Sequence, residues 1–128
     1  MNSSLSRRQW LKTGAALAAG LACGNSFADK PWPGGQPIRI IVPFPAGGVN
    51  DVVARQFADL LGPLLQTSII VDNKPGAGGS MGMDALARSA PDGHTLAFSG
   101  ISTLTLLPHV MKVTYDPMKQ FSAVASTM

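Results

Sequence analysis

Three short apolar runs rich in β-branched or aromatic side chains lie along the chain, at residues 38–42, 68–72 and 95–99. Their length and composition predict buried β-strands. The segments between them, 49–64 and 81–89, carry apolar residues at helical spacing and predict helices that cover the sheet. This alternation of strands and helices predicts an α/β fold with a parallel sheet and right-handed crossovers.

The first helix is expected to turn one apolar stripe toward the sheet. Its apolar residues recur every three or four positions, whereas Gln56 and Asp59 fall on other faces. Asn50 or Asp51 is the natural cap or first-turn acid, because side-chain oxygens accept the free amide hydrogens at a helix start. The residues expected to be buried along the stripe are Val53, Phe57, Leu60, Leu61 and Leu64.

The second helix and the segments after it give weaker patterns. Ser80 is the expected cap of the second helix. Residues 104–111 predict a short helix that is broken near Pro108, because proline interrupts helical hydrogen bonding. Residues 123–125 predict the start of a further strand.

Glycine-rich loops follow the first two predicted strands, at residues 43–48 and 73–79. In a parallel sheet both loops lie at the carboxyl edge, where ligands of α/β proteins bind. Each loop offers unobstructed backbone N–H groups beside a helix start, an environment that favours a carboxylate or a phosphate. Nucleotide-binding patterns fail, since Met81 stands where a dinucleotide fingerprint needs glycine and no Walker lysine follows. The alternative that these glycines only allow tight turns stays open.

The charge of the chain is concentrated at its start. Lysine and arginine number 10 against 7 acidic residues, and Arg7, Arg8 and Lys12 all precede the first acid, Asp29. From Asp29 onward, basic and acidic residues are equal in number. A nucleic-acid-binding protein needs a basic surface on its folded part, so we expect no nucleic-acid partner.

Residues 1–28 have the features of an export signal peptide. Arg7 and Arg8 precede an uncharged run of Ala, Gly and Leu, and small residues allow cleavage after Ala28. The arginine pair and the weak hydrophobicity favour the twin-arginine route, with a general secretory signal as the alternative. Cleavage would leave residues 29–128, enough for one small domain.

Candidate catalytic and metal-binding groups are few. Cys23, the only cysteine, lies within the signal, where lipidation is a further alternative, so the mature chain has no thiol. His94 and His109 have no spacing that indicates a shared metal or a catalytic triad, and residues 99–102 do not form a nucleophile elbow. We therefore expect a non-enzymatic protein with no metal and no cofactor.

The sequence resembles the Bug (Bordetella uptake gene) family over nearly all of residues 37–125. The resemblance is carried by the segments PIRIIVPF, GGVND, VDNKPGAGGSMG, PDGHTL and YDPMKQF. Members of this family are the extracytoplasmic solute-binding proteins of tripartite tricarboxylate transporters. The resemblance implies a type II periplasmic-binding-protein (Venus flytrap) fold, and implies that residues 29–128 are a truncated N-terminal part of its domain 1, with a parallel sheet and flanking helices.

The resemblance also implies a ligand, partners and a location. In the family, backbone amides of two loops hold a small tricarboxylate, dicarboxylate or similar organic anion in the periplasm, and membrane permease subunits receive it. The candidate ligand-binding residues lie in the two glycine loops and in the loop after the third strand. They are Phe44, Ala46, Gly47, Gly48, Asn50, Asp51, Gly76, Ala77, Gly78, Gly79, Ser99 and Ser102.

Two alternative functions stay open. One is an exported α/β enzyme whose catalytic groups lie in a missing C-terminal part. The other is a truncated remnant without function. A chromophore bound to the purified protein would favour the enzyme.

Replacing Arg7 and Arg8 together by lysine should leave the precursor in the cytoplasm. Both changes keep the charge, which a general secretory signal tolerates, whereas the twin-arginine route requires the arginine pair. Cell fractionation and immunoblotting of the double variant against the wild type measure the effect. Normal export of the double variant would contradict the twin-arginine assignment.

Overall fold

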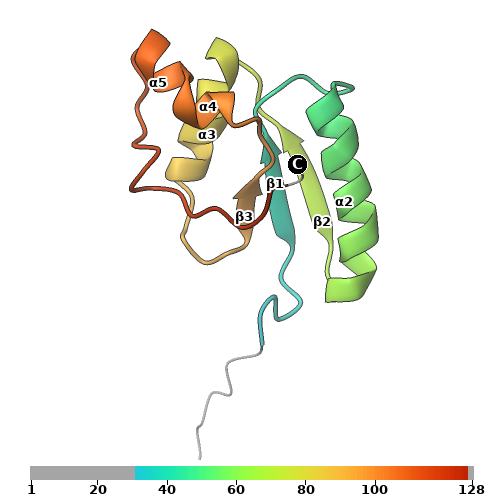
Figure 1. Cartoon of the computed structure of the whole chain (residues 1–128). Coiled ribbons are helices and arrows are strands. Elements are labelled where there is room, and N and C mark those ends of the chain that lie inside the picture. The colour runs from blue at the N-terminus through green and yellow to red at the C-terminus, as the bar shows by residue number, and fades with distance from the viewer. Residues whose placement is uncertain (1–30, 127–128) are drawn as a thin grey trace, which may run out of the picture. The chain divides into compact units, whose positions relative to one another are not determined.

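The computed structural model describes residues 31–126, and their central element is a three-stranded sheet with the order β2-β1-β3 (Figure 1). The strands are β1 (Ile38–Val42), β2 (Ile69–Asn73) and β3 (Thr95–Ala97). Both neighbours of β1 run parallel to it, with Ile40 beside Val71 and Leu96. The α/β fold, the three strands and their parallel pairing are confirmed. The third strand ends two residues earlier than predicted.

Five helical segments accompany the sheet in the described part of the chain. They are α2 (Val49–Leu65), the 3-10 turn η1 (Ala77–Gly79), α3 (Ser80–Ala87), α4 (Ser102–Thr105) and α5 (Leu107–Val110). The expected break near Pro108 is confirmed, because α4 and α5 are separated at Leu106 and Pro108 lies in the first turn of α5. Among residues 31–126, no helix is long and apolar enough to cross a membrane.

The two longer helices lie on opposite sides of the sheet (Figure 1). Successive residues of a strand point to opposite faces. Ile40 and Val42 form a buried cluster with Ala54 of α2 on one face. Ile41, also buried, points to the other face, where α3 lies. The central strand is thus covered on both faces.

The apolar stripe predicted for α2 is not buried as expected. The helix has its buried residues, Asp51 and Ala54, on a different line of its surface. Of the five stripe residues, Val53 is half-buried, whereas the other four are 36–76% exposed. The prediction was wrong because α2 reaches the core through the small Ala54, while Phe57 contacts Phe98 at 5.8 Å between ring centroids and the leucines of the stripe remain exposed. The exposed members are Phe57 (36%), Leu60 (69%), Leu61 (37%) and Leu64 (76%).

Two smaller predictions were also wrong. Ser80 is the first residue of α3 rather than its cap, and Gly79 occupies the cap position without a side-chain bond. Residues 123–125 form no strand, because the segment 121–126 has no regular structure and the sheet of the described residues consists of three strands. The predicted export signal, 1–28, lies outside the described residues.

The C-terminus of α2 ends on a residue in the left-handed conformation, Gln66, with φ of 51°. The N–H of Thr67 donates to the Gly62 carbonyl at 3.2 Å, and the N–H of Gln66 donates to the Pro63 carbonyl at 3.4 Å. This pair of bonds is the Schellman motif, in which glycine is the preferred left-handed residue because a Cβ atom is disfavoured there.

Replacing Gln66 by glycine should raise the free energy of unfolding by about 0.5–1 kcal/mol. The gain from relieving the left-handed residue is partly offset by the larger chain entropy of glycine in the unfolded state. Urea unfolding followed by circular dichroism measures the change. Gln66→Ala is the matched control, because it keeps the Cβ and should bring no such gain. Equal midpoints for Gln66→Gly and Gln66→Ala would show that the left-handed cap stores no strain.

Candidate ligand-binding site

Three loops meet at the carboxyl edge of the sheet. We call residues 43–48, after β1, loop 1; residues 74–79, after β2, loop 2; and residues 98–101, after β3, loop 3. With the strand order β2-β1-β3, loop 1 begins the connection from β1 to β2 on one side, whereas β3 lies on the other side of β1. Loops 1 and 3 therefore flank a topological switch point, the position at which open α/β sheets bind ligands.

Loop 2 and the start of α3 pack closely against the other two connections. A Cβ atom at Gly79 would lie 2.9 Å from Cγ2 of Thr103, which follows loop 3. A Cβ at Gly82, in the first turns of α3, would lie 2.6 Å from Cβ of Pro43 in loop 1 and 3.1 Å from the Lys74 carbonyl oxygen. These two glycines are therefore needed for packing, whatever else the loops do.

Residues 76–79, which we call the crown of loop 2, have an unusual backbone. All four have positive φ, with values of 139°, 46°, 66° and 100°. Three of them are glycines, which adopt this region at little cost, while Ala77 is the exception. Ala77 and Gly78 are exposed, and Gly79 is buried. The loop thus presents its backbone, rather than large side chains, at the edge of the sheet.

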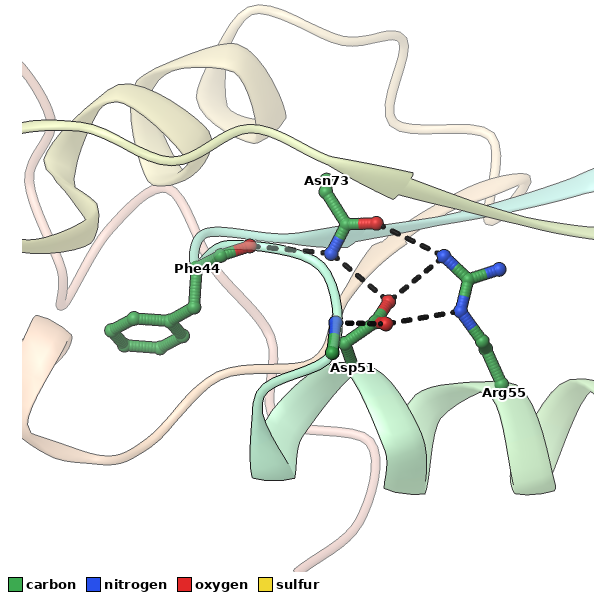
Figure 2. Close-up of polar contacts among 5 residues, drawn as sticks. Phe44, Asp51, Arg55 and Asn73 are labelled. Carbon is green, nitrogen blue, oxygen red and sulfur yellow. Dashed lines mark hydrogen bonds and ion pairs between the residues drawn. The ribbon is translucent and has the colours of Figure 1, made fainter.

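A buried carboxylate, that of Asp51, organises loop 1 (Figure 2). Its Oδ2 accepts the N–H of Gly47 at 2.8 Å and Nε of Arg55 at 3.1 Å. Its Oδ1 accepts Nδ2 of Asn73 at 3.0 Å and lies 3.0 Å from Nη2 of Arg55. Asn73 in turn donates to the Phe44 carbonyl oxygen at 3.2 Å. One side chain thereby joins the ends of two strands to the first turn of α2.

These contacts stabilise the charged form of the carboxylate. Hydrogen bonds from Arg55, Gly47 and Asn73 lower the pKa of Asp51 from its ordinary value of 3.8 to about 2, against the opposing effect of burial. Both oxygens of Asp51 and the N–H of Gly47 are therefore already bonded within the protein. Asp51 therefore holds loop 1 in place from a buried position, with only 3% of its surface exposed.

Loop 3 is held by hydroxyl groups. Oγ of Ser99 and Oγ1 of Thr103 lie 2.8 Å apart, and Thr103 donates to the Gly100 carbonyl at 2.8 Å. The buried hydroxyl of Tyr115 donates to the Thr103 carbonyl at 2.6 Å. Ser102, at the start of α4, is exposed. Residues 99–103 thus form one hydrogen-bonded turn beside loop 2.

The residues predicted for the site fall into three groups by exposure. Two are buried and serve packing or loop shape, namely Asp51 and Gly79. Four are half-buried: Phe44, Asn50, Gly76 and Ser99. Six are exposed at the edge: Ala46, Gly47, Gly48, Ala77, Gly78 and Ser102.

Sequence reasoning gave no role to Arg55, Asn73 or Thr103. The spacing of Asp51 and Arg55, four positions apart on a helix, was a usable signal for an ion pair. The contacts of Asn73 and Thr103 could not be predicted from sequence spacing, because their partners depend on how the loops meet in space. Within residues 31–126, no cluster of three or more His, Cys, Asp or Glu side chains could hold a metal ion.

Comparison with known proteins decides the family. Residues 53–128 match the family described as "Tripartite tricarboxylate transporter family receptor". The chain belongs to this receptor family. BugT of Bordetella pertussis is 43% identical over 97 residues, which cover 72% of this chain and 29% of BugT. A protein of Cupriavidus necator, "UPF0065 protein in gbd 5'region", is 38% identical over 112 residues, covering 86% of this chain and 33% of that protein.

Two solved structures share the fold over part of their length. A structure described as "Structure of a periplasmic transporter" has a TM-score of 0.61 and 40% identity, covering 65% of this chain and 28% of that one. MatC from Rhodopseudomonas palustris, solved with bound malate, has a TM-score of 0.56 and 33% identity, covering 66% of this chain and 29% of MatC. The resemblance to the Bug family is confirmed. The chain spans about a third of the length of the curated relatives it matches.

Replacing Asp51 by asparagine should lower the unfolding midpoint at neutral pH and flatten the acid side of the stability profile. Because the folded pKa of about 2 lies below the unfolded value of 3.8, the stabilisation by Asp51 is complete above about pH 5 and is lost as the pH falls toward 2. Urea unfolding at a series of pH values between 2 and 7 measures both effects.

The control for this experiment is Asp59→Asn, which changes an exposed aspartate on the same helix. It should leave the acid side of the profile close to that of the wild type. If Asp51→Asn and the wild type lost stability equally between pH 4 and pH 2, the ionised carboxylate of Asp51 would not be what stabilises loop 1.

Proposed function

We propose that this protein is part of, or acts as, the periplasmic solute-binding receptor of a tripartite transporter. It would capture a small di- or tricarboxylate with loops 1, 2 and 3 and deliver the anion to the membrane permease subunits. The observation that carries the proposal is the convergence of three connections, two of them glycine-rich, at the switch point of a parallel sheet in a chain of this family.

Backbone groups are suited to the recognition of a carboxylate here. Loop 1 leads into the N-terminus of α2, a helix of 17 residues, where unpaired amides and the helix dipole attract an anion. The exposed crown of loop 2, at Ala77 and Gly78, brings further backbone to the same edge. The malate bound in the relative MatC belongs to the ligand class that such a site would accept.

The roles of the candidate residues follow from their exposure. The exposed crown of loop 2 and the exposed residues of loop 1 contact the anion, with Ser99 and Ser102 supplying hydroxyl groups. Asp51 orients loop 1 without touching the ligand. Arg55 is paired with Asp51, so backbone dipoles rather than this guanidinium meet the charge of the anion.

Gly78→Val should weaken carboxylate binding by roughly two to four orders of magnitude. Its φ of 66° is unfavourable for a branched residue, and its Cβ would lie 3.0 Å from Cδ1 of Leu107. The displaced loop would lose two charge-assisted hydrogen bonds, each worth about 1.5–3 kcal/mol. Calorimetric titration of the full gene product with malate, succinate, adipate and citrate measures the affinity.

The matched control is Gly35→Val. Gly35 also has a positive φ, of 80°, but open space surrounds its Cβ position and it precedes β1, far from the carboxyl edge. The control variant carries a similar backbone strain and should bind like the wild type. Full affinity in Gly78→Val would show that loop 2 only forms a turn, and the absence of binding by the wild type to every carboxylate would refute the proposed function.

A further inference from the structure

Asn73 occupies the junction between the two glycine-rich loops. It is the last residue of β2 and directly precedes loop 2, yet all of its side-chain bonds lead to loop 1 and α2 (Figure 2). Its Nδ2 donates to the Phe44 carbonyl at 3.2 Å and to Oδ1 of Asp51 at 3.0 Å. Its Oδ1 accepts from Nη2 of Arg55 at 3.1 Å.

These three bonds use both amide hydrogens of Asn73 and its oxygen. The groups it faces require this pattern, since two are acceptors and one is a donor. No other side chain of the same size supplies two donated bonds and one accepted bond in this arrangement. A fully bonded network of this kind permits one geometry, because each alternative leaves a partly buried polar group without a partner.

We propose that Asn73 is a positioning residue of the ligand site, which fixes loop 1 relative to loop 2 before the ligand arrives. This inference rests on the proposed function. The ligand then binds to loops that are already ordered, and its affinity is not reduced by the entropy of ordering them. Without the side chain, the Phe44 carbonyl loses its hydrogen bond to β2. Loop 1 is then held by the bond from Gly47 to Asp51 and by the backbone bonds of Gly48 with Pro45 and Val52.

The charges around residue 73 make the role testable by pH. Asp51 and Arg55 face it from α2, Asp72 and Lys74 flank it in the chain and pair with each other at 3.3 Å, and loop 1 contains no charged residue. An ionised aspartate at position 73 would place acceptors against the Phe44 carbonyl and the Asp51 carboxylate. A protonated aspartate would regain one donor.

The experiment compares malate affinities of the full gene product in four forms: the wild type, Asn73→Ala, Asn73→Asp and Ile38→Val. Asn73→Ala removes all three side-chain hydrogen bonds and should bind malate about 10–100-fold more weakly, because the net contribution of each bond is modest. Asn73→Asp should be similarly weak at pH 7 and, relative to the wild type at the same pH, recover part of its affinity at pH 4. Ile38→Val destabilises the opposite end of β1, where Ile38 is 1% exposed, and should stay within about twofold of the wild type.

Wild-type affinity in Asn73→Ala would overturn the proposal. An equal loss of affinity in Ile38→Val would also overturn it, because the loss would then follow from lower stability alone. The exchange rate of the Gly47 amide, measured by nuclear magnetic resonance without ligand, separates this inference from the proposed function. Exchange at least about tenfold faster in Asn73→Ala supports the positioning of loop 1 even if no carboxylate binds, and unchanged exchange refutes it.

Discussion

The buried carboxylate of Asp51 is the contact on which the arrangement of the carboxyl edge depends. A charge in this position is tolerated only when its oxygens are fully bonded, and here Gly47, Arg55 and Asn73 supply the donors. The bonds fix how α2 is rotated about its own axis and where loop 1 runs. With α2 in this position, Leu60 and Leu64 are largely exposed, whereas Phe57 contacts Phe98, with ring centroids 5.8 Å apart.

The strands and helices were predictable because their signals are local. Apolar runs, glycine loops and helical spacing each lie within a few residues of the element they specify. The order of these elements then places loops 1 and 2 at one edge of a parallel sheet, as the structure shows. For the same reason the sequence indicated the region of the candidate site, although it did not identify the groups that shape it.

The remaining features depend on contacts between distant residues. The bond that joins the first turn of α2 to the end of β2 connects Asp51 and Asn73, which are 22 positions apart. Helical periodicity identifies an apolar stripe but cannot show how much of that stripe the other elements cover. The segment 123–125 has strand-like composition, but a strand also needs a neighbouring strand to pair with.

The close contact between Gly82 and Pro43 has a consequence for how such a receptor can diversify. A methyl group at position 82 would overlap loop 1, so the path of loop 1 and the start of α3 can change only together. Insertions or altered backbone paths at this edge therefore need compensating changes in two segments at once. Exposed side chains at this edge, such as those of Ala46 and Ser102, can change without moving either segment.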